Sequence, residues 1–115
     1  MITGTGIDIV QCSRMEGKDE GVLKHILSRE ELLSGRTDPE YLSSRFAAKE
    51  AFSKALGTGI RGFSMTEITV REDELGRPYF FLEGRAAELA SGLTLHLSIT
   101  HEREYAAAVV IAERK

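Results

Sequence analysis

The sequence lacks the features that would place the chain in a membrane or outside the cell. No apolar run approaches the roughly 18 residues needed to cross a bilayer. The first residues, MITGTGIDIV, have neither the basic start nor the continuous apolar block of a secretory signal. Cys12 is the only cysteine, which excludes an internal disulfide and a thiolate cluster for zinc. We therefore expect a cytoplasmic protein with no membrane partner.

The chain also lacks a basic excess, internal repeats and low-complexity segments. Its 15 Lys and Arg residues are outnumbered by 18 Asp and Glu residues, which gives a net charge of −3. Proteins that grip long nucleic acids usually show the opposite balance, so we expect no nucleic-acid partner. A small phosphorylated ligand remains possible, because basic residues cluster between Arg45 and Arg61. The length of 115 residues predicts one domain, residues 1–115.

Hydrophobic periodicity predicts a strand followed by helical sequence in the first third of the chain. Residues 2–10 alternate with period two. One face of this strand carries Ile7 and Ile9, and the other carries Gly4, Gly6 and Asp8. Residues 20–33 predict a helix with an inward apolar set of Val22, Ile26, Leu27 and Leu33. Alternatively, Ser28 and Glu31 form a capping box that restarts the helix.

The best-defined predicted element is a helix over residues 39–56. Asp38 can cap it, Pro39 suits the first helical position, and Gly57 is a C-terminal stop. One apolar stripe comprises Tyr41, Ala48, Phe52, Ala55 and Leu56. Phe46 lies off that stripe, which predicts burial on two sides.

The rest of the chain predicts strands and one short helix. Residues 66–71 and 79–82 read as a hairpin around a turn at residues 73–78. A short helix over residues 84–91 precedes an alternating strand near residues 95–100. The last strand, residues 105–112, is nearly all apolar, which is expected when the fold or another subunit covers both faces. The fold class is α+β.

Asp8 is a carboxylate in a strand that otherwise holds apolar residues and glycine. Burying this charge without a partner would cost on the order of several kcal/mol. A salt bridge or a backbone hydrogen bond could compensate it, and so could a metal ion or a substrate. The flanking glycines favour a site, because they leave space for a ligand to approach the backbone.

Four charges stand among small and aromatic residues in the segment from Arg45 to Gly57. Glu50 and Lys54 are spaced for an ordinary helix-surface ion pair, worth about 0.3–0.5 kcal/mol. Phe46, one turn before Glu50, makes a fully solvated face less expected. A glutamate partly shielded by an aromatic ring can be a metal ligand or a base.

Two further features are weaker signals. The turn Gly57-Thr58-Gly59 is of a kind that mostly reverses the chain, although Lys54 and Arg61 beside it suit a phosphate. His101 lies at a strand end, where histidines are more often structural than functional. The three histidines of the chain show no zinc-ligand spacing.

Three segments together resemble the signature blocks of the holo-acyl-carrier-protein synthase family. They are Gly6-Ile7-Asp8-Ile9-Val10, RFAAKEAFSKALGTG from Arg45 to Gly59, and LSITHEREYAA from Leu97 to Ala107. The middle block is highly specific, and the order of the blocks and their distances to the termini also match. The resemblance implies an antiparallel sheet packed against a long central helix, in a homotrimer with sites at subunit interfaces.

The resemblance also implies a reaction. Members of the family transfer 4′-phosphopantetheine from coenzyme A to a serine of an acyl carrier protein, a step of fatty acid biosynthesis, and release adenosine 3′,5′-bisphosphate. By motif position Asp8 and Glu50 would bind Mg²⁺, and Glu50 would act as the base, directly or through a metal-bound water. We therefore expect Asp8, Glu50 and Lys54 to be the catalytic residues.

By the same resemblance, Arg45, Lys54 and His101 would contact the phosphates of coenzyme A. Gly57, Thr58 and Gly59 would shape the pocket wall. Arg14 is the expected contact for the carrier protein, in a segment whose basic residues are interleaved with acidic ones. Two alternatives stay open: a non-catalytic module that binds coenzyme A or a nucleotide, and a structural trimeric subunit.

Overall fold

The computed structural model describes residues 1–57 and 62–115. Its strands form two antiparallel sheets, one of three strands in the order β1-β5-β4 and one of two strands, β2-β3. The strands are β1 (Ile2–Gln11), β2 (Ile68–Glu72), β3 (Pro78–Leu82), β4 (Leu93–His101) and β5 (Tyr105–Arg114). The helices are η1 (Cys12–Met15), α1 (Glu20–Ile26), α2 (Arg29–Leu33), α3 (Pro39–Leu56), η2 (Met65–Glu67) and α4 (Gly84–Leu89). The expected α+β class with antiparallel sheets is confirmed.

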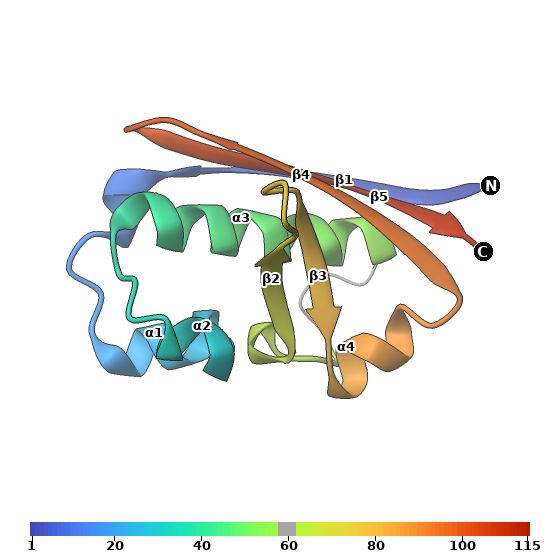
Figure 1. Cartoon of the computed structure of the whole chain (residues 1–115), viewed down its shortest axis with the longest axis horizontal. Coiled ribbons are helices and arrows are strands. Elements are labelled where there is room, and N and C mark those ends of the chain that lie inside the picture. The colour runs from blue at the N-terminus through green and yellow to red at the C-terminus, as the bar shows by residue number, and fades with distance from the viewer. Residues whose placement is uncertain (58–61) are drawn as a thin grey trace.

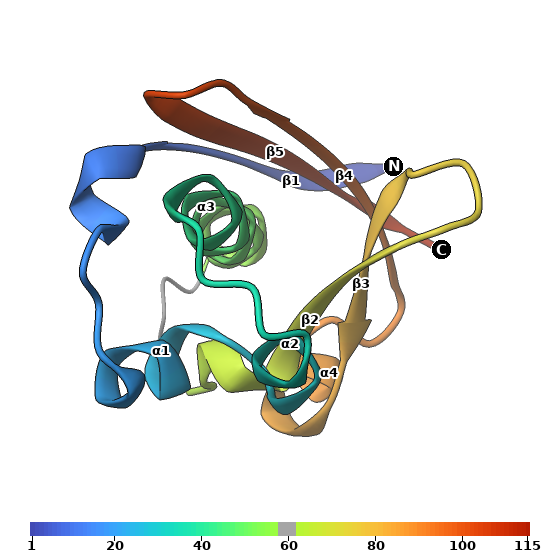
Figure 2. The same ribbon diagram turned by 60° about the vertical axis from the view of Figure 1, so that its left-hand side comes forward.

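Helix α3 is the middle layer of the molecule. Figures 1 and 2 show it between the three-stranded sheet on one side and α1, α2 and the β2–β3 hairpin on the other. Ala47, Ala48 and Ala51 of α3 are fully buried. The predicted burial on two sides is therefore present, and a single chain supplies both sides without a second subunit.

The ends of α3 lie where local signals predicted them. The Asp38 carboxylate accepts a hydrogen bond from the backbone N–H of Tyr41 at 3.2 Å, and Pro39 occupies the first turn. Gly57 ends the helix at φ 74°, a left-handed conformation that favours glycine. These caps need only neighbouring residues, which is why the sequence predicts them well.

Strand β1 approaches α3 through its glycines. A Cβ added to Gly6 would lie 2.0 Å from the Ala51 carbonyl oxygen, and one added to Gly4 would lie 1.9 Å from that of Ala55. The expectation that these glycines leave room for a ligand is wrong, because the backbone of α3 fills that space. Ile7 and Ile9 point the other way and are 68% and 64% exposed.

The region before α3 holds two helices rather than one. The alternative of a capping box is confirmed: the Ser28 N–H donates to Glu31 Oε1 at 2.9 Å, and the Glu31 N–H donates to Ser28 Oγ at 3.3 Å. Val22 and Leu33 are exposed, contrary to expectation. The restart at Ser28 changes the helical phase, so one continuous apolar face does not form.

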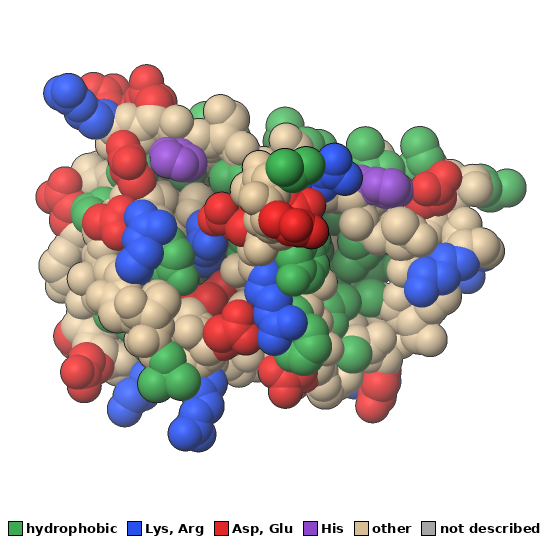
Figure 3. Space-filling model, in the orientation of Figure 1, with side chains coloured by type: hydrophobic (Ala, Val, Ile, Leu, Met, Phe, Trp, Pro, Cys, Tyr) green, Lys and Arg blue, Asp and Glu red, His purple; other side chains and the backbone are tan. Residues whose placement is uncertain are grey.

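The second half of the chain follows the predicted order, with the hairpin β2–β3, a short helix and two strands. On β5 the inward residues Ala106, Ala108, Val110 and Ala112 are buried, while the alternate residues are only half-buried. Ile7 and Ile9 extend this apolar outer face of the sheet, and Figure 3 shows hydrophobic side chains along the upper edge of the molecule. Within the described residues, no helix is long and apolar enough to span a membrane.

Candidate functional site

Strand β1 and helix α3 bring Asp8 and Lys54 into contact. Lys54 Nζ donates to Asp8 Oδ1 at 3.2 Å and to the Ile7 carbonyl oxygen at 2.9 Å. The Lys54 side chain is half-exposed, and that of Asp8 is 18% exposed. The salt bridge considered for Asp8 therefore forms. Among the described residues, Lys54 makes this pair with Asp8 and none with Glu50, so the expected helix-surface pair is absent.

Glu50 completes this cluster from α3. Burial raises the pKa of the Glu50 carboxyl, the nearby charge of Asp8 raises it further, and Lys54 opposes both effects. In residues 1–57 and 62–115 its carboxylate accepts no hydrogen bond. Two carboxylates thus repel each other beside one cation, and a second cation would relieve that repulsion.

The donor set of this cluster fits a hard divalent cation with an incomplete protein shell. Mg²⁺ prefers oxygen ligands and is usually held by one or two carboxylates, with water and phosphate oxygens in the other positions. Over the described part of the chain, no group of three or more His, Cys, Asp or Glu side chains could hold a metal. Asp8 and Glu50 alone match the sparse set that Mg²⁺ uses with phosphate substrates.

A separate pocket surrounds Arg45 and His101. It is lined by Arg45, Val70, Glu72, Gly76, Pro78, Ile99 and His101. The Arg45 guanidinium stacks at 4.3 Å over the Tyr41 ring and donates to Ser44 Oγ at 3.1 Å. Its Nε is buried and has no hydrogen-bond partner among the described residues. A buried cation with an unused donor beside a histidine suits an anion such as a phosphate.

The charges around this pocket are only loosely paired. Arg45 NH2 lies 3.6 Å from Glu72 Oε1, and the Arg45 side chain is 12% exposed. His101 Nδ1 lies 3.8 Å from Glu40 Oε2, with both side chains well exposed. These long contacts leave both basic groups able to take another acidic partner.

The structure divides the expected site into two clusters, which we call the carboxylate cluster (Asp8, Glu50, Lys54) and the arginine pocket (Arg45, His101). Lys54 and Arg45 are nine residues apart on α3, which is about 180° around the helix. Asp8 and His101 lie on β1 and β4, the two edges of the three-stranded sheet. Helix and sheet geometry therefore keeps Arg45 and His101 apart from Lys54 within a single chain, and their expected joint contact with coenzyme A at a subunit interface stays a prediction.

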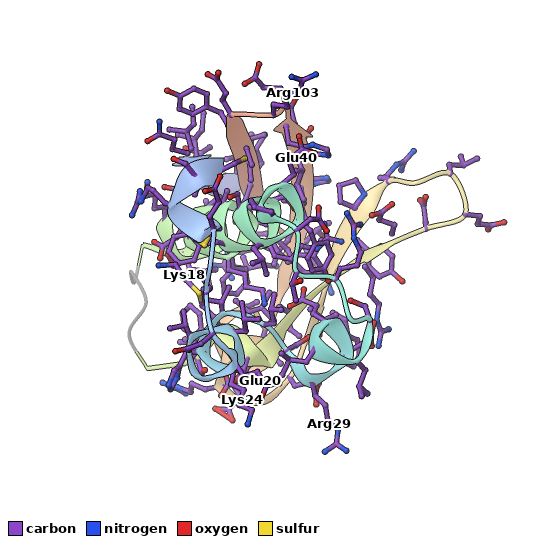
Figure 4. All side chains as sticks on the ribbon, turned by 90° about the vertical axis from the view of Figure 1, so that its left-hand side faces the viewer. Lys18, Glu20, Lys24, Arg29, Glu40 and Arg103 are labelled. Atoms are coloured by element: carbon purple, nitrogen blue, oxygen red, sulfur yellow. The ribbon has the colours of Figure 1, made fainter. Side chains whose placement is uncertain are left out.

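The other expected residues are placed as follows. Gly57 forms the C-terminal cap of α3, and its N–H donates to the Lys54 carbonyl oxygen at 3.1 Å. Thr58 and Gly59 lie outside the described residues. Arg14 is exposed in η1, directly after β1. Figure 4 shows side chains of both charge signs on this side of the molecule, the basic Lys18, Lys24 and Arg29 and the acidic Glu20 and Glu40 among them.

Sequence reasoning missed a buried ion pair between Lys49 of α3 and Glu31 of α2, with Nζ 2.6 Å from Oε1. One signal was present in the sequence. Phe46 and Phe52, three residues before and after Lys49, share its side of the helix, and a charge between two aromatic side chains indicates burial.

The family model of the 4′-phosphopantetheinyl transferase superfamily matches residues 4–110. The chain therefore belongs to this superfamily of enzymes. The expectation drawn from the three sequence blocks is confirmed at this level.

Relatives within the superfamily cover the whole chain. A holo-[acyl-carrier-protein] synthase of Treponema denticola is 48% identical over 122 residues, which cover 98% of this chain and 99% of that protein. The crystal structure of the Neisseria meningitidis holo-[acyl-carrier-protein] synthase matches with a TM-score of 0.90 and 39% identity, over 99% of this chain and 100% of that one. A Bacillus anthracis holo-(acyl-carrier-protein) synthase in complex with CoA (3′,5′-ADP) matches with a TM-score of 0.85 and 36% identity, over 100% and 99%.

Proposed function

We propose that this chain transfers the 4′-phosphopantetheine arm of coenzyme A to a serine of an apo acyl carrier protein. The products would be the holo carrier protein and adenosine 3′,5′-bisphosphate. The observation that carries the proposal is the carboxylate cluster, in which Asp8 and Glu50 lie beside Lys54 in a chain of this superfamily. The synthases named above, one of them bound to coenzyme A, support the choice of co-substrate and acceptor.

Asp8 and Glu50 are the residues that would hold Mg²⁺. The ion would supply positive charge to the pyrophosphate of coenzyme A and stabilise the charge that develops on the leaving bisphosphate. Lys54 lies beside Asp8 and would add a second positive charge toward the same phosphates. Magnesium would thus complete a site that the protein leaves short of ligands.

Glu50 is our proposed base. Burial and the nearby charge of Asp8 raise the pKa of its carboxyl, which favours proton uptake, as a base requires. The carrier serine loses its proton to Glu50, and its oxygen forms a bond to the phosphorus of the phosphopantetheine. The bond from that phosphorus to the bisphosphate breaks in the same displacement. The chain itself supplies no nucleophile, and its work is positioning and electrostatics.

We further infer that the active form is a homotrimer in which one chain supplies the carboxylate cluster and its neighbour the arginine pocket. The placement of the two clusters supports this, because in one chain they lie on opposite sides of α3 and at opposite edges of the three-stranded sheet. The apolar outer face around Ile7, Ile9 and Val109 offers a surface for association. Gly57, Thr58 and Gly59 remain our proposed wall of the pocket.

The shared site can be tested by mixing two inactive variants. Asp8→Ala removes the carboxylate cluster and Arg45→Ala removes the arginine pocket. After the two are dissociated and reassembled together, mixed trimers should regain part of the transfer activity. No recovery, with mixed trimers demonstrated by native mass spectrometry, would contradict a site shared between chains.

Arg14 is our proposed contact for the carrier protein. The acidic residues interleaved with basic ones in the segment that follows it predict a weaker electrostatic attraction to an acidic carrier than an all-basic segment would give. A single-domain chain acting in the cytoplasm agrees with the lone cysteine, since disulfide-free proteins are usual there.

The direct test is to incubate the protein with coenzyme A, Mg²⁺ and an apo carrier protein and to weigh the carrier. A serine-linked mass gain of one phosphopantetheine is the expected result. Binding of coenzyme A without that gain would favour a non-catalytic binding module. A trimer that neither binds coenzyme A nor modifies the carrier would favour a structural subunit.

A further inference from the structure

The interior beside the site contains a lysine and a glutamate that are both fully enclosed. The side chains of Lys49 and Glu31 are 0% and 2% exposed, and Lys49 Nζ also donates to the Ile26 carbonyl oxygen at 2.8 Å. Over the described residues, no other ion pair has both partners buried. Neither residue faces the carboxylate cluster or the arginine pocket, so the proposed chemistry does not use them.

The Glu31 carboxylate is saturated by donors from several segments. Oε1 accepts from Lys49 Nζ and from the Ser28 N–H, and Oε2 accepts from the Val70 N–H at 2.9 Å. Ser28 Oγ in turn accepts from Thr69 Oγ1 at 2.7 Å. The Glu31–Lys49 ion pair therefore links α3 to the end of α1, to α2 and to β2.

Stability is a poor explanation for this arrangement. Both side chains are enclosed, and taking two charges out of water is costly even when they pair. Apolar residues of similar volume often replace a buried ion pair without loss of stability. What the pair provides and apolar residues do not is direction, because hydrogen bonds hold only over a narrow range of angles.

On its opposite face α3 meets β1 through the contacts of Gly6 with Ala51 and of Gly4 with Ala55, which are backbone and small-residue contacts. The directional contacts on that face come from one half-exposed side chain, Lys54, which donates to Asp8 and to the Ile7 carbonyl oxygen. They resist rotation of the helix about its axis less than a buried, fully hydrogen-bonded pair does. A rotation would carry Glu50 away from Asp8.

We propose that the Glu31–Lys49 ion pair is the positioning pair of the site and sets the rotation of α3. It thereby places Glu50, the next residue, opposite Asp8, and it places Arg45 against the β2–β3 hairpin. The second effect is direct, because Val70 both donates to Glu31 and lines the arginine pocket. The inference rests on the transferase function proposed above.

The test compares variants that keep the volume of the pair. Glu31→Gln keeps the size and shape of the side chain but loses the negative charge, and Glu31→Gln with Lys49→Met removes both charges. Transfer rates are measured over a range of coenzyme A and divided by the folded fraction from near-ultraviolet circular dichroism. We expect kcat per folded molecule to fall about tenfold or more in both, with a raised KM for coenzyme A. Lys49→Arg keeps a cation at this position, so it should keep more of the wild-type kcat than either of these variants.

Ile68→Ala is the matched control, because it opens a cavity in the other core cluster and lowers stability without touching the ion pair. It should leave kcat and KM per folded molecule unchanged. The inference is overturned if the folded Glu31→Gln or double variant keeps wild-type kcat and KM, or if Ile68→Ala loses as much kcat as they do. Failure of the wild-type protein to modify the carrier would instead contradict the proposed function.

Discussion

Lys49 and Lys54 lie little more than one turn apart on α3, and each meets a carboxylate from another segment. The pair of Lys49 with Glu31 is sealed in the interior, where every oxygen of the carboxylate accepts hydrogen bonds from the protein. The pair of Lys54 with Asp8 lies at the surface beside a third charge, Glu50, whose carboxylate has no partner in the described residues.

The difference separates two uses of the same two residue types. A saturated buried pair has no capacity left for a ligand, so it can only hold segments in place. A half-exposed pair beside a second carboxylate keeps oxygen atoms free and carries unrelieved repulsion, which a bound cation would remove. On this helix the proposed chemistry therefore depends on carboxylate oxygens that the described residues do not fully pair.

The largest expected effect is on catalysis, when a carboxylate of the exposed site is removed. Glu50→Ala removes a proposed metal ligand and base, and Asp8→Ala removes the other ligand. Each should lower the transfer rate by about 10²–10³-fold, since one electrostatic group in a site is commonly worth that much. Steady-state rates with an apo carrier protein measure this. Glu74→Ala, in the exposed hairpin turn, is the control and should keep the wild-type rate.

The next effect is on stability and sets the two lysines directly against each other. Lys49→Met strands Glu31 as a buried charge and should lower the free energy of unfolding by about 3–5 kcal/mol. Lys54→Met breaks an exposed pair and should cost less than about 1 kcal/mol. Urea unfolding of both variants gives the comparison. Equal losses would mean that the two pairs do not differ as described.

A smaller effect concerns the approach that brings Asp8 to α3. Gly6→Ala forces a methyl group against the Ala51 carbonyl and should cost about 1–3 kcal/mol by overpacking. It should also reduce transfer, because β1 must shift away from the helix. Gly21→Ala, inside α1 with only a 3.4 Å contact to the Asp19 side chain, should be neutral or stabilising by thermal melting. A silent Gly6→Ala would rule out the close packing of β1 on α3.

The smallest effect is on the pH dependence of stability, and its sign distinguishes Glu50 from Glu31. The pKa of Glu50 is raised in the folded state, so its contribution to stability is present at low pH and is lost as the pH rises through the folded pKa. Glu50→Gln should therefore slightly raise the melting temperature at neutral pH, and the gain should vanish in acid. Glu31→Gln should lower the melting temperature at neutral pH, because it removes the partner of buried Lys49. Melting curves from pH 4 to pH 8 measure both changes. A change in melting temperature of the same sign for the two variants at neutral pH would contradict this prediction.

Local signals explain what the sequence predicted correctly. Asp38, Pro39 and Gly57 act through their own neighbours, so the bounds of α3 could be read without knowledge of the fold. Asp8 and Glu50 stand out as charges in apolar or aromatic surroundings and the family resemblance selects the same two residues, whose roles stay a prediction.

Tertiary contacts explain what the sequence could not predict. Lys49 and Glu31 are 18 residues apart, and a lysine within a helix usually indicates a solvated face. The glycines of β1 looked like space for a ligand, because only the folded chain reveals that α3 occupies it. The division into two clusters depends on which face of α3 meets the sheet, a rotation that short-range patterns do not encode.

The central proposal is that the carboxylates of Asp8 and Glu50 hold a Mg²⁺ ion on which the transfer of phosphopantetheine depends. The most direct measurement is the initial rate of carrier modification against Mg²⁺ concentration, by intact-protein mass spectrometry, for the wild type and for Asp8→Ala. The account predicts a wild-type rate that is negligible after chelation and saturates with Mg²⁺, and no comparable rise for the variant. A wild-type rate that survives chelation, or a variant that saturates at the wild-type rate, would contradict it.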